Sequence, residues 1–245
     1  MTPLTTVAAV INAERIKLTT VRSPLWSTAA VVVLSLGIAA LQTAAAYDPE
    51  QLSAPTAAMG VAVFGVPVLM VVAAMTVTGE YRTGMVRTTF LASPGRTLVL
   101  VAKAVVAAVF SGSVGAVMVL GSILVARVDL DAAAWRTTAA VGVYAASAAV
   151  LGVGVAVLLR HTAGAVTVLL LWPLLVEPLL GNLPGRGPQI GPYLPFANVF
   201  EFLDVQWLFP SYAMHWGPDG SLGYFLTVVA AVFVTAVVAV NRRDA

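Results

Sequence analysis

Long apolar runs alternate with short polar segments along the whole chain. A helix needs ~20 mostly apolar residues to cross the ~30 Å hydrocarbon core of a bilayer. Six runs reach this length, so the pattern predicts an all-α integral membrane protein with six transmembrane helices. We expect the spans at about residues 25–45, 57–78, 98–126, 137–159, 163–181 and 222–240.

Two of these spans carry further signals. The third is long enough to tilt or kink, and its small residues at 111–116 predict a tight helix–helix contact. The fifth contains the pairs Trp172-Pro173 and Glu177-Pro178. Because proline removes a backbone donor, the outer end of this span should bend or break.

Residues 5–20, before the first span, predict an amphipathic helix that lies in the inner membrane interface. On a helical wheel its apolar face consists of Val7, Val10, Ile11 and Leu18. Arg15 and Lys17 flank this face, whereas Glu14 falls on it. An unpaired carboxylate is costly there, so Glu14 should become protonated, find a base or extend to the lipid headgroups.

Composition and charge narrow the class of protein. Of the 245 residues, 60% are hydrophobic and 10% charged, whereas a soluble domain is usually ~25% charged. The net charge is +2, but the bases are spread without a basic tract, so we expect no nucleic-acid partner. The partner that this composition predicts is the lipid bilayer.

The basic residues also predict the orientation. With the N-terminus inside, ten of the 13 Lys and Arg residues lie on the cytoplasmic side and three outside, as the positive-inside rule expects. Both termini are then cytoplasmic, residues 79–97 form a cytoplasmic loop, and residues 182–221 form an extracellular segment. A short aromatic helix at 198–209 would either anchor the outer leaflet or contact a substrate.

Several kinds of active site are disfavoured by the residues present. Lys17 and Lys103 are the only lysines, and neither follows a glycine as a phosphate-binding Walker A loop requires. Ser111 lies in a span, whereas His161 and His215 fall at the inner and outer surfaces, so an activated serine is not expected. With no cysteine and no ligand-spaced histidines, we expect no metal site.

Two charges lie within the predicted spans. Lys103 is a few residues inside the third span and can extend to the cytoplasm. Glu177 lies in the outer third of the fifth span, where a carboxylate is by default a candidate for an outer cavity or translocation role. Alternatively, Glu177 caps a helix or pairs with Arg186 near the outer surface.

The densest group of charges lies between spans two and three. Residues 79–103 carry one acid and four bases, whereas the 22 residues before them carry none. The core of this segment predicts a short amphipathic helix that stops at Ser93-Pro94-Gly95. Such a helix lies on the membrane surface or is held by another protein, and composition does not separate the two.

These segments resemble those of ABC-2 type permeases. The cytoplasmic loop of that family is similar to the segment marked by Glu80, Arg87, Ser93, Pro94, Arg96 and Lys103. The N-terminal segment resembles the start of actinobacterial members through a Glu-x-x-Lys-Leu-x-x-x-Arg-Ser pattern. That pattern consists of Glu14, Lys17, Leu18, Arg22 and Ser23. The six spans agree as well, so the resemblance covers essentially the whole chain.

The resemblance implies a transmembrane subunit of an ATP-binding cassette exporter in the bacterial inner membrane. Two copies of a separate ATPase subunit would bind ATP and Mg, and a second permease chain would complete the transporter. This chain would then be no enzyme and would bind no cofactor. The cargo would be hydrophobic or amphipathic, such as a drug, an antibiotic or a lipid.

The resemblance also assigns roles to residues. The loop 79–97 would be a coupling helix seated in the ATPase. Its contacts would come from Glu80, Tyr81, Arg82, Met85 and Arg87. Glu14, Lys17 and Arg22 would belong to the interfacial helix, and Glu14 would form a bridge to Arg82 or Arg87.

Two other functions are carried as alternatives. A stand-alone secondary transporter needs an internal coupling site, which only Glu177 offers. A membrane scaffold that transports nothing would use the outer aromatic segment as its partner surface.

Overall fold

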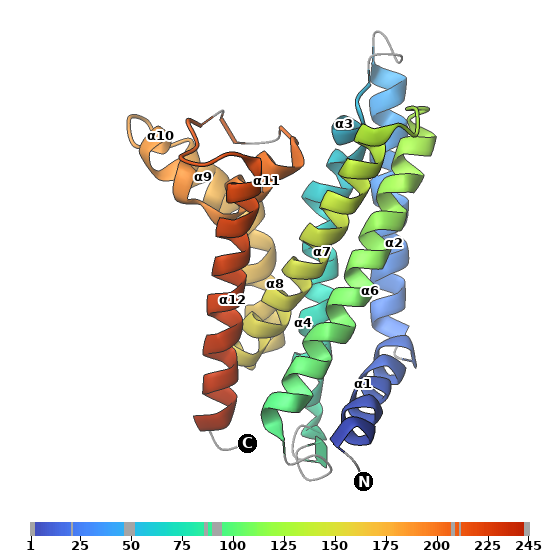
Figure 1. The fold of residues 1–245 in the computed structure, drawn as a ribbon, viewed down its shortest axis with the longest axis vertical. Coiled ribbons are helices and arrows are strands. Elements are labelled where there is room, and N and C mark those ends of the chain that lie inside the picture. The colour runs from blue at the N-terminus through green and yellow to red at the C-terminus, as the bar shows by residue number, and fades with distance from the viewer. Residues whose placement is uncertain are drawn as a thin grey trace.

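The computed structural model describes residues 3–20, 22–46, 52–85, 88–89, 95–206, 209–210 and 212–242. Over these ranges every regular element is helical, and six helices are long and apolar enough to cross a membrane, as predicted. Figure 1 shows the long helices side by side, with both chain ends at the same end of the bundle. The assignment of that end to the cytoplasm rests on the distribution of basic residues in the sequence.

The elements follow the predicted order. The chain begins with α1 (Pro3–Thr20), which packs against α2 and α6. Four spans are single helices: α2 (Arg22–Ala45), α6 (Arg96–Val125), α7 (Ala132–Leu159) and α12 (Pro218–Arg242). The second span consists of α3 (Ala54–Gly60), a π turn (Val61–Gly65) and α4 (Val66–Thr83). The fifth consists of α8 (Thr162–Leu171), a π turn (Trp172–Val176) and α9 (Glu177–Gly181). Three short elements lie at the end opposite the termini: α10 (Gly187–Ile190), a 3-10 turn (Gly191–Tyr193) and α11 (Pro195–Leu203).

The second span is longer than predicted. It starts at Ala54 and runs to Thr83, so it takes in the first residues of the predicted loop 79–97. The apolar pattern ends near Thr78, but the backbone hydrogen bonds of the helix continue through the polar last turn. The helix stops at Gly84, whose φ of 71° is the left-handed conformation that favours glycine after a helix.

Prolines make two spans irregular. As predicted, the fifth span is distorted near one end, which lies opposite the termini and where the π turn Trp172–Val176 contains Pro173. The helix then resumes at Glu177 and ends at Gly181. A second π turn, Val61–Gly65, comes just before Pro67 and was not expected from the sequence. In each case proline cannot donate to the preceding turn, and a wider turn accommodates the missing bond.

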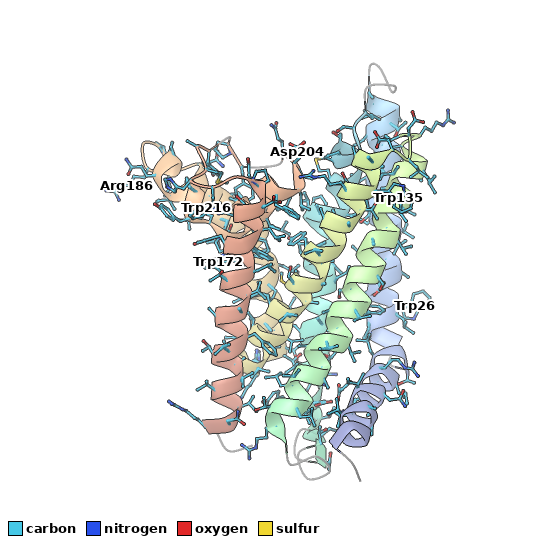
Figure 2. All side chains as sticks on the ribbon, viewed as in Figure 1. Trp26, Trp135, Trp172, Arg186, Asp204 and Trp216 are labelled. Carbon is cyan, nitrogen blue, oxygen red and sulfur yellow. The ribbon has the colours of Figure 1, made fainter. Side chains whose placement is uncertain are left out.

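Two spans form the centre of the bundle. The apolar windows of the α3–α4 span and of α7 are 72% and 67% buried, whereas those of the other spans are 22–33% buried. The outer spans therefore present most of their apolar side chains outward, as lipid-facing helices do. In Figure 2 these side chains project from the whole length of α2 and α12.

The aromatic residues at the end opposite the termini divide between core and surface. The predicted helix 198–209 is observed in part: α11 begins at Pro195 and ends at Leu203, where Asp204 adopts a left-handed conformation. Trp207 lies outside the described residues. Phe200 belongs to the helix that was expected to anchor the membrane surface or contact a substrate, but it is 5% exposed and its ring lies 6.3 Å from that of Tyr144 on α7. Phe225 of α12 joins the same edge-to-face group at 5.8 Å from Tyr144. This ring cluster ties α11 to the bundle.

Small residues allow the central helices to approach closely. A β-carbon on Gly112 would lie 3.1 Å from the carbonyl oxygen of Gly142, and one on Gly115 would lie 2.9 Å from the β-carbon of Ala145. The predicted contact at 111–116 is thus confirmed, and its partner is α7. On the other side of α7, a β-carbon on Gly152 would lie 2.3 Å from the carbonyl oxygen of Met70.

Gly152→Ala is expected to destabilise the protein, because α4 and α7 must separate to admit one methyl group. Overpacking of this kind costs about 1–3 kcal/mol. Thermal unfolding in detergent should show a lower midpoint for Gly152→Ala than for the wild type. Gly37→Ala is the matched control, since a β-carbon there meets nothing within 4 Å. An unchanged midpoint for Gly152→Ala would contradict the close contact.

Candidate functional site

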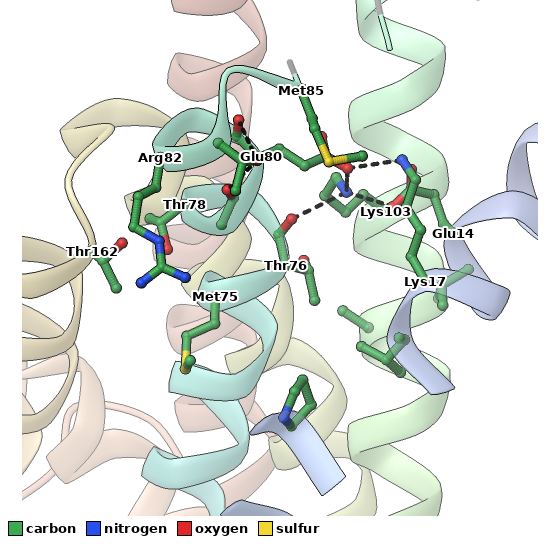
Figure 3. Close-up of a pocket in the computed structure, with 16 residues that line it drawn as sticks. Glu14, Lys17, Met75, Thr76, Thr78, Glu80, Arg82, Met85, Lys103 and Thr162 are labelled. Carbon is green, nitrogen blue, oxygen red and sulfur yellow. Dashed lines mark hydrogen bonds and ion pairs between the residues drawn. The ribbon is translucent and has the colours of Figure 1, made fainter. Parts of the chain in front are cut away.

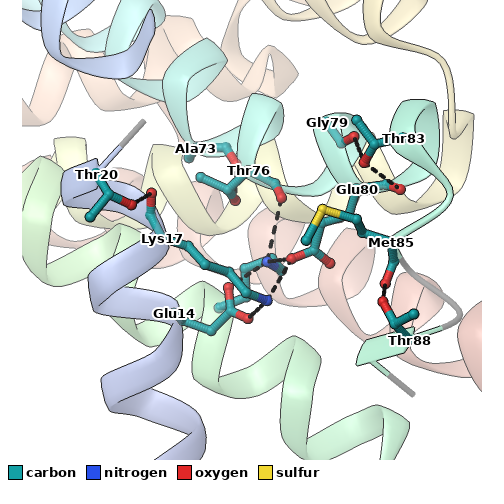
Figure 4. Close-up of polar contacts among 11 residues, drawn as sticks. Glu14, Lys17, Thr20, Ala73, Thr76, Gly79, Glu80, Thr83, Met85 and Thr88 are labelled. Atoms are coloured by element: carbon teal, nitrogen blue, oxygen red, sulfur yellow. Dashed lines mark hydrogen bonds and ion pairs between the residues drawn. The ribbon is translucent and has the colours of Figure 1, made fainter. Parts of the chain in front are cut away.

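Four charged side chains from three helices meet at the end of the bundle that holds the termini. Glu14 and Lys17 come from α1, Glu80 from the last turns of α4, and Lys103 from α6. Lys17 Nζ lies 2.8 Å from Glu14 Oε1 and 2.8 Å from Glu80 Oε1 (Figure 4). Lys103 Nζ bonds Glu14 Oε2 and lies 3.1 Å from Glu80 Oε1 (Figure 3). We call these four residues the charge cluster.

The charge cluster is electrically neutral and largely buried, although the Lys17 side chain is 37% exposed. The side chains of Glu14 and Lys103 are 4% and 6% exposed, and that of Glu80 is 12% exposed. Lys103 Nζ also lies 3.4 Å from the backbone oxygen of Thr76, at the edge of hydrogen-bonding range. Charges in such surroundings are tolerated when each is paired and hydrogen-bonded. The two acids and two bases meet this condition together, since each Lys contacts both Glu side chains.

The ion pairs control the protonation of the α1 residues. Burial by itself would raise the pKa of the Glu14 carboxyl, but Lys103 and Lys17 outweigh it and hold that pKa below its usual value. Burial would lower the pKa of the Lys17 ammonium, yet its bonds to Glu14 and Glu80 hold that pKa above its usual value. Both groups therefore stay charged at neutral pH.

Local structure explains how the charge cluster is assembled. Glu14 and Lys17 are three residues apart, so they lie on one face of α1. Leu18 beside them is buried, which places the predicted apolar face of α1 against the bundle. Among the outcomes predicted for Glu14, the structure selects a pairing with bases.

The structure corrects two expectations for this region. Glu14 pairs with Lys17 and Lys103 rather than with Arg82, which extends toward Thr162 in Figure 3. Arg87, the other predicted partner, lies outside the described residues, as does the side chain of Arg22. Lys103 was expected to extend to the cytoplasm, but its side chain is 6% exposed and is held inside by Glu14 and Glu80.

The remaining coupling candidates surround the charge cluster. The ring of Tyr81 lies 5.3 Å from the guanidinium carbon of Arg160, within cation–π range. Arg82 and Met85 are exposed. The structure therefore brings Glu80 together with the α1 residues and leaves Arg82 and Met85 at the surface.

A cavity of about 370 Å³ adjoins the charge cluster (Figure 3). It is bounded by α1, the start of α2, α4, α6 and the first residue of α8. The polar residues of its lining include the charge cluster, Arg82, Thr78 and Thr162, and the apolar residues include Leu18, Pro24, Met75, Val106 and Ala107.

Glu177 lies at the opposite end of the molecule and is fully buried. Its Oε1 accepts a hydrogen bond from Trp172 Nε1 at 2.8 Å. Its Oε2 accepts from the backbone N–H groups of Phe196 and Ala197 at 2.8 and 3.2 Å, in the first turn of α11. This carboxylate therefore caps a helix, one of the two predicted outcomes, and the exposed Arg186 takes no part in these bonds.

The two histidines have local contacts. His161 Nδ1 accepts from the backbone N–H of Gly164 at 3.1 Å and so caps α8. The ring of His215 lies 5.2 Å from that of Tyr193.

Comparison with known proteins adds no assignment: no protein-family model matches the chain, and no curated protein sequence matches it.

Removing one member of the charge cluster should destabilise the protein more than removing an opposite pair. Glu14→Gln leaves two bases against Glu80, and Lys103→Met leaves two acids against Lys17. Breaking a buried pair in this way costs about 3–5 kcal/mol. The double variant keeps the Lys17–Glu80 pair and should be more stable than the sum of the single effects. Chemical unfolding of the four proteins measures this coupling, and simple additivity would contradict it.

Glu177→Gln is expected to loosen α11. An amide has one acceptor oxygen, so its NH₂ group must face either Trp172 Nε1 or the backbone donors of α11. Leaving a buried donor unpaired costs about 1–3 kcal/mol. Thermal unfolding should show the loss, whereas Glu201→Gln, on an exposed position of the same helix, should leave the midpoint unchanged. Equal midpoints for both variants would exclude the capping role.

Proposed function

We propose that this chain is the permease subunit of an ATP-binding cassette exporter. Two copies of a separate ATPase subunit would bind ATP and Mg and drive it, and a second permease chain would complete the transporter. Both termini would be cytoplasmic and the membrane would be the bacterial inner membrane. The observation that carries the proposal is the charge cluster, which joins α1, α4 and α6 where the predicted coupling loop begins.

A force applied at this loop has a continuous path through the molecule. The α3–α4 span is an unbroken helical run of 30 residues, including one π turn. At 1.5 Å per residue it is about 45 Å long, enough to reach from the loop to the opposite surface. Its close contact with α7 at Gly152 transmits motion to the central helices. Movement of the loop would therefore displace the packed core as a unit.

The surface beside the charge cluster suits a protein partner. Arg82, Thr83 and Met85 are exposed at the end of α4 and offer a base, a hydroxyl and a flexible apolar side chain. Exposed Arg and Met are enriched at protein interfaces. Glu80, by contrast, is engaged with both lysines, so its role is to position the end of α4 rather than to contact the ATPase.

The capping role of Glu177 weakens the secondary-transporter alternative. A coupling carboxylate must exchange a proton or ion during transport. Both oxygens of Glu177 already accept hydrogen bonds from three donors in the surrounding helices. The cargo of the exporter is proposed to be hydrophobic or amphipathic, in keeping with the apolar faces of the spans.

Co-purification tests the proposal. The full chain, tagged at its C-terminus and extracted in mild detergent, should capture a Walker-type ATPase that mass spectrometry identifies. Arg82→Glu/Met85→Glu should lose most of the captured ATPase, because it alters the exposed contact surface. Arg186→Glu, at the other end of the molecule, is the matched control and should retain it. Absence of an ATPase even after crosslinking would refute the exporter assignment.

A further inference from the structure

The cavity beside the charge cluster contains a base that the cluster does not neutralise. Over the described residues, its lining carries three bases and two acids, which gives these residues a net charge of +1. Lys17 and Lys103 are paired with Glu14 and Glu80. Within the described ranges, no ion pair joins Arg82 to an acid, and Figure 3 shows its side chain extending toward Thr162, away from Lys103. The excess positive charge therefore resides on Arg82.

A second polar group of the cavity has unused bonding capacity. Thr78 is 1% exposed, and its Oγ1 has no hydrogen-bond partner over the described residues. Neighbouring threonines on α4 behave differently: Thr76 donates to the carbonyl of Ala73 at 2.7 Å, and Thr83 donates to that of Gly79 at 2.9 Å. Thr78 and Arg82 are four residues apart, so they lie on the same face of α4. A hydroxyl and a guanidinium thus line one part of the cavity together (Figure 3).

Much of the remaining lining is apolar. Leu18, Met75 and Val106 come from α1, α4 and α6 and adjoin the polar groups. The cavity also lies between the last turns of α4 and the C-terminal end of α1. An interfacial α1 would place it at the depth of the lipid headgroups. The hydrogen-bond donors of Arg82 and Thr78, next to apolar side chains, match an anion that carries a hydrocarbon chain. A small soluble anion would gain nothing from the apolar wall.

We propose that this cavity binds the phosphate headgroup of an anionic phospholipid from the leaflet at which α1 lies. The Arg82 guanidinium and the Thr78 hydroxyl donate to the phosphate oxygens. One acyl chain lies along Leu18, Met75 and Val106. The neutral charge cluster forms the far wall, and its paired carboxylates do not repel the phosphate as isolated ones would. This site requires no ATPase partner.

Lipid binding to the purified full chain tests the site. Phosphatidic acid and phosphatidylcholine with identical acyl chains are titrated separately, and bound lipid is counted by native mass spectrometry. The wild type should prefer phosphatidic acid, and Arg82→Gln should weaken phosphatidic acid binding about tenfold, as expected for a lost charge-assisted hydrogen bond. Thr78→Val should weaken it by a smaller factor. Arg186→Gln is the matched control and should bind like the wild type.

Three results would overturn the site: no preference for phosphatidic acid in the wild type, a preference that survives Arg82→Gln, or an equal loss in Arg186→Gln. Glycerol 3-phosphate is added as a soluble competitor. If it displaces phosphatidic acid at similar concentrations, the ligand is a soluble phosphate and the lipid assignment is wrong. Thermal midpoints of all variants are compared, and a tenfold loss at an unchanged midpoint assigns the effect to binding. ATPase capture is measured separately, so either proposal can fail alone.

Discussion

Neutralisation of buried charge is the constraint on which the arrangement of α1, α4 and α6 depends. Glu14 and Lys103 are almost completely buried, and either one alone would be strongly destabilising in these surroundings. Because each lysine of the charge cluster contacts both glutamates, removing any one of the four side chains leaves an unbalanced charge. The position of α1 is therefore fixed by electrostatics as well as by the packing of Leu18.

The same constraint connects the charge cluster to the rest of the bundle. Glu80 fixes the end of α4, and α4 meets α7 through the close approach of Met70 and Gly152. On its other side α7 meets α6, which carries Lys103, through Gly112. Charge pairing at one end and small-residue packing along the spans thus reinforce one set of helix positions. In a membrane, where apolar association gives little driving force between helices, both contributions matter.

The sequence was a good guide to what depends on local pattern. The six spans follow from hydropathy, the contact at 111–116 follows from small residues, and the distortion near Trp172 follows from proline. Pairings between distant residues were not predictable in this way. From the sequence, Lys103 was expected to extend to the headgroups. Its partner Glu14 lies 89 positions earlier in the chain, and no local pattern around Lys103 indicates that pairing. The sequence did contain one signal for this pairing: a base inside a span, Lys103, and an acid on the apolar face of a helix, Glu14, each of which needs a partner of opposite charge.

Glu177 and Glu14 show two solutions to the same problem at opposite ends of the molecule. Glu177 is held by neutral donors, namely an indole N–H and two backbone N–H groups at the start of α11, which are fixed in number and direction. Glu14 is held by two flexible lysine side chains that also serve Glu80. The first arrangement favours a rigid cap on α11. The second can exchange partners while it stays neutral, so the end that holds α1 is the better place for a contact that changes during function.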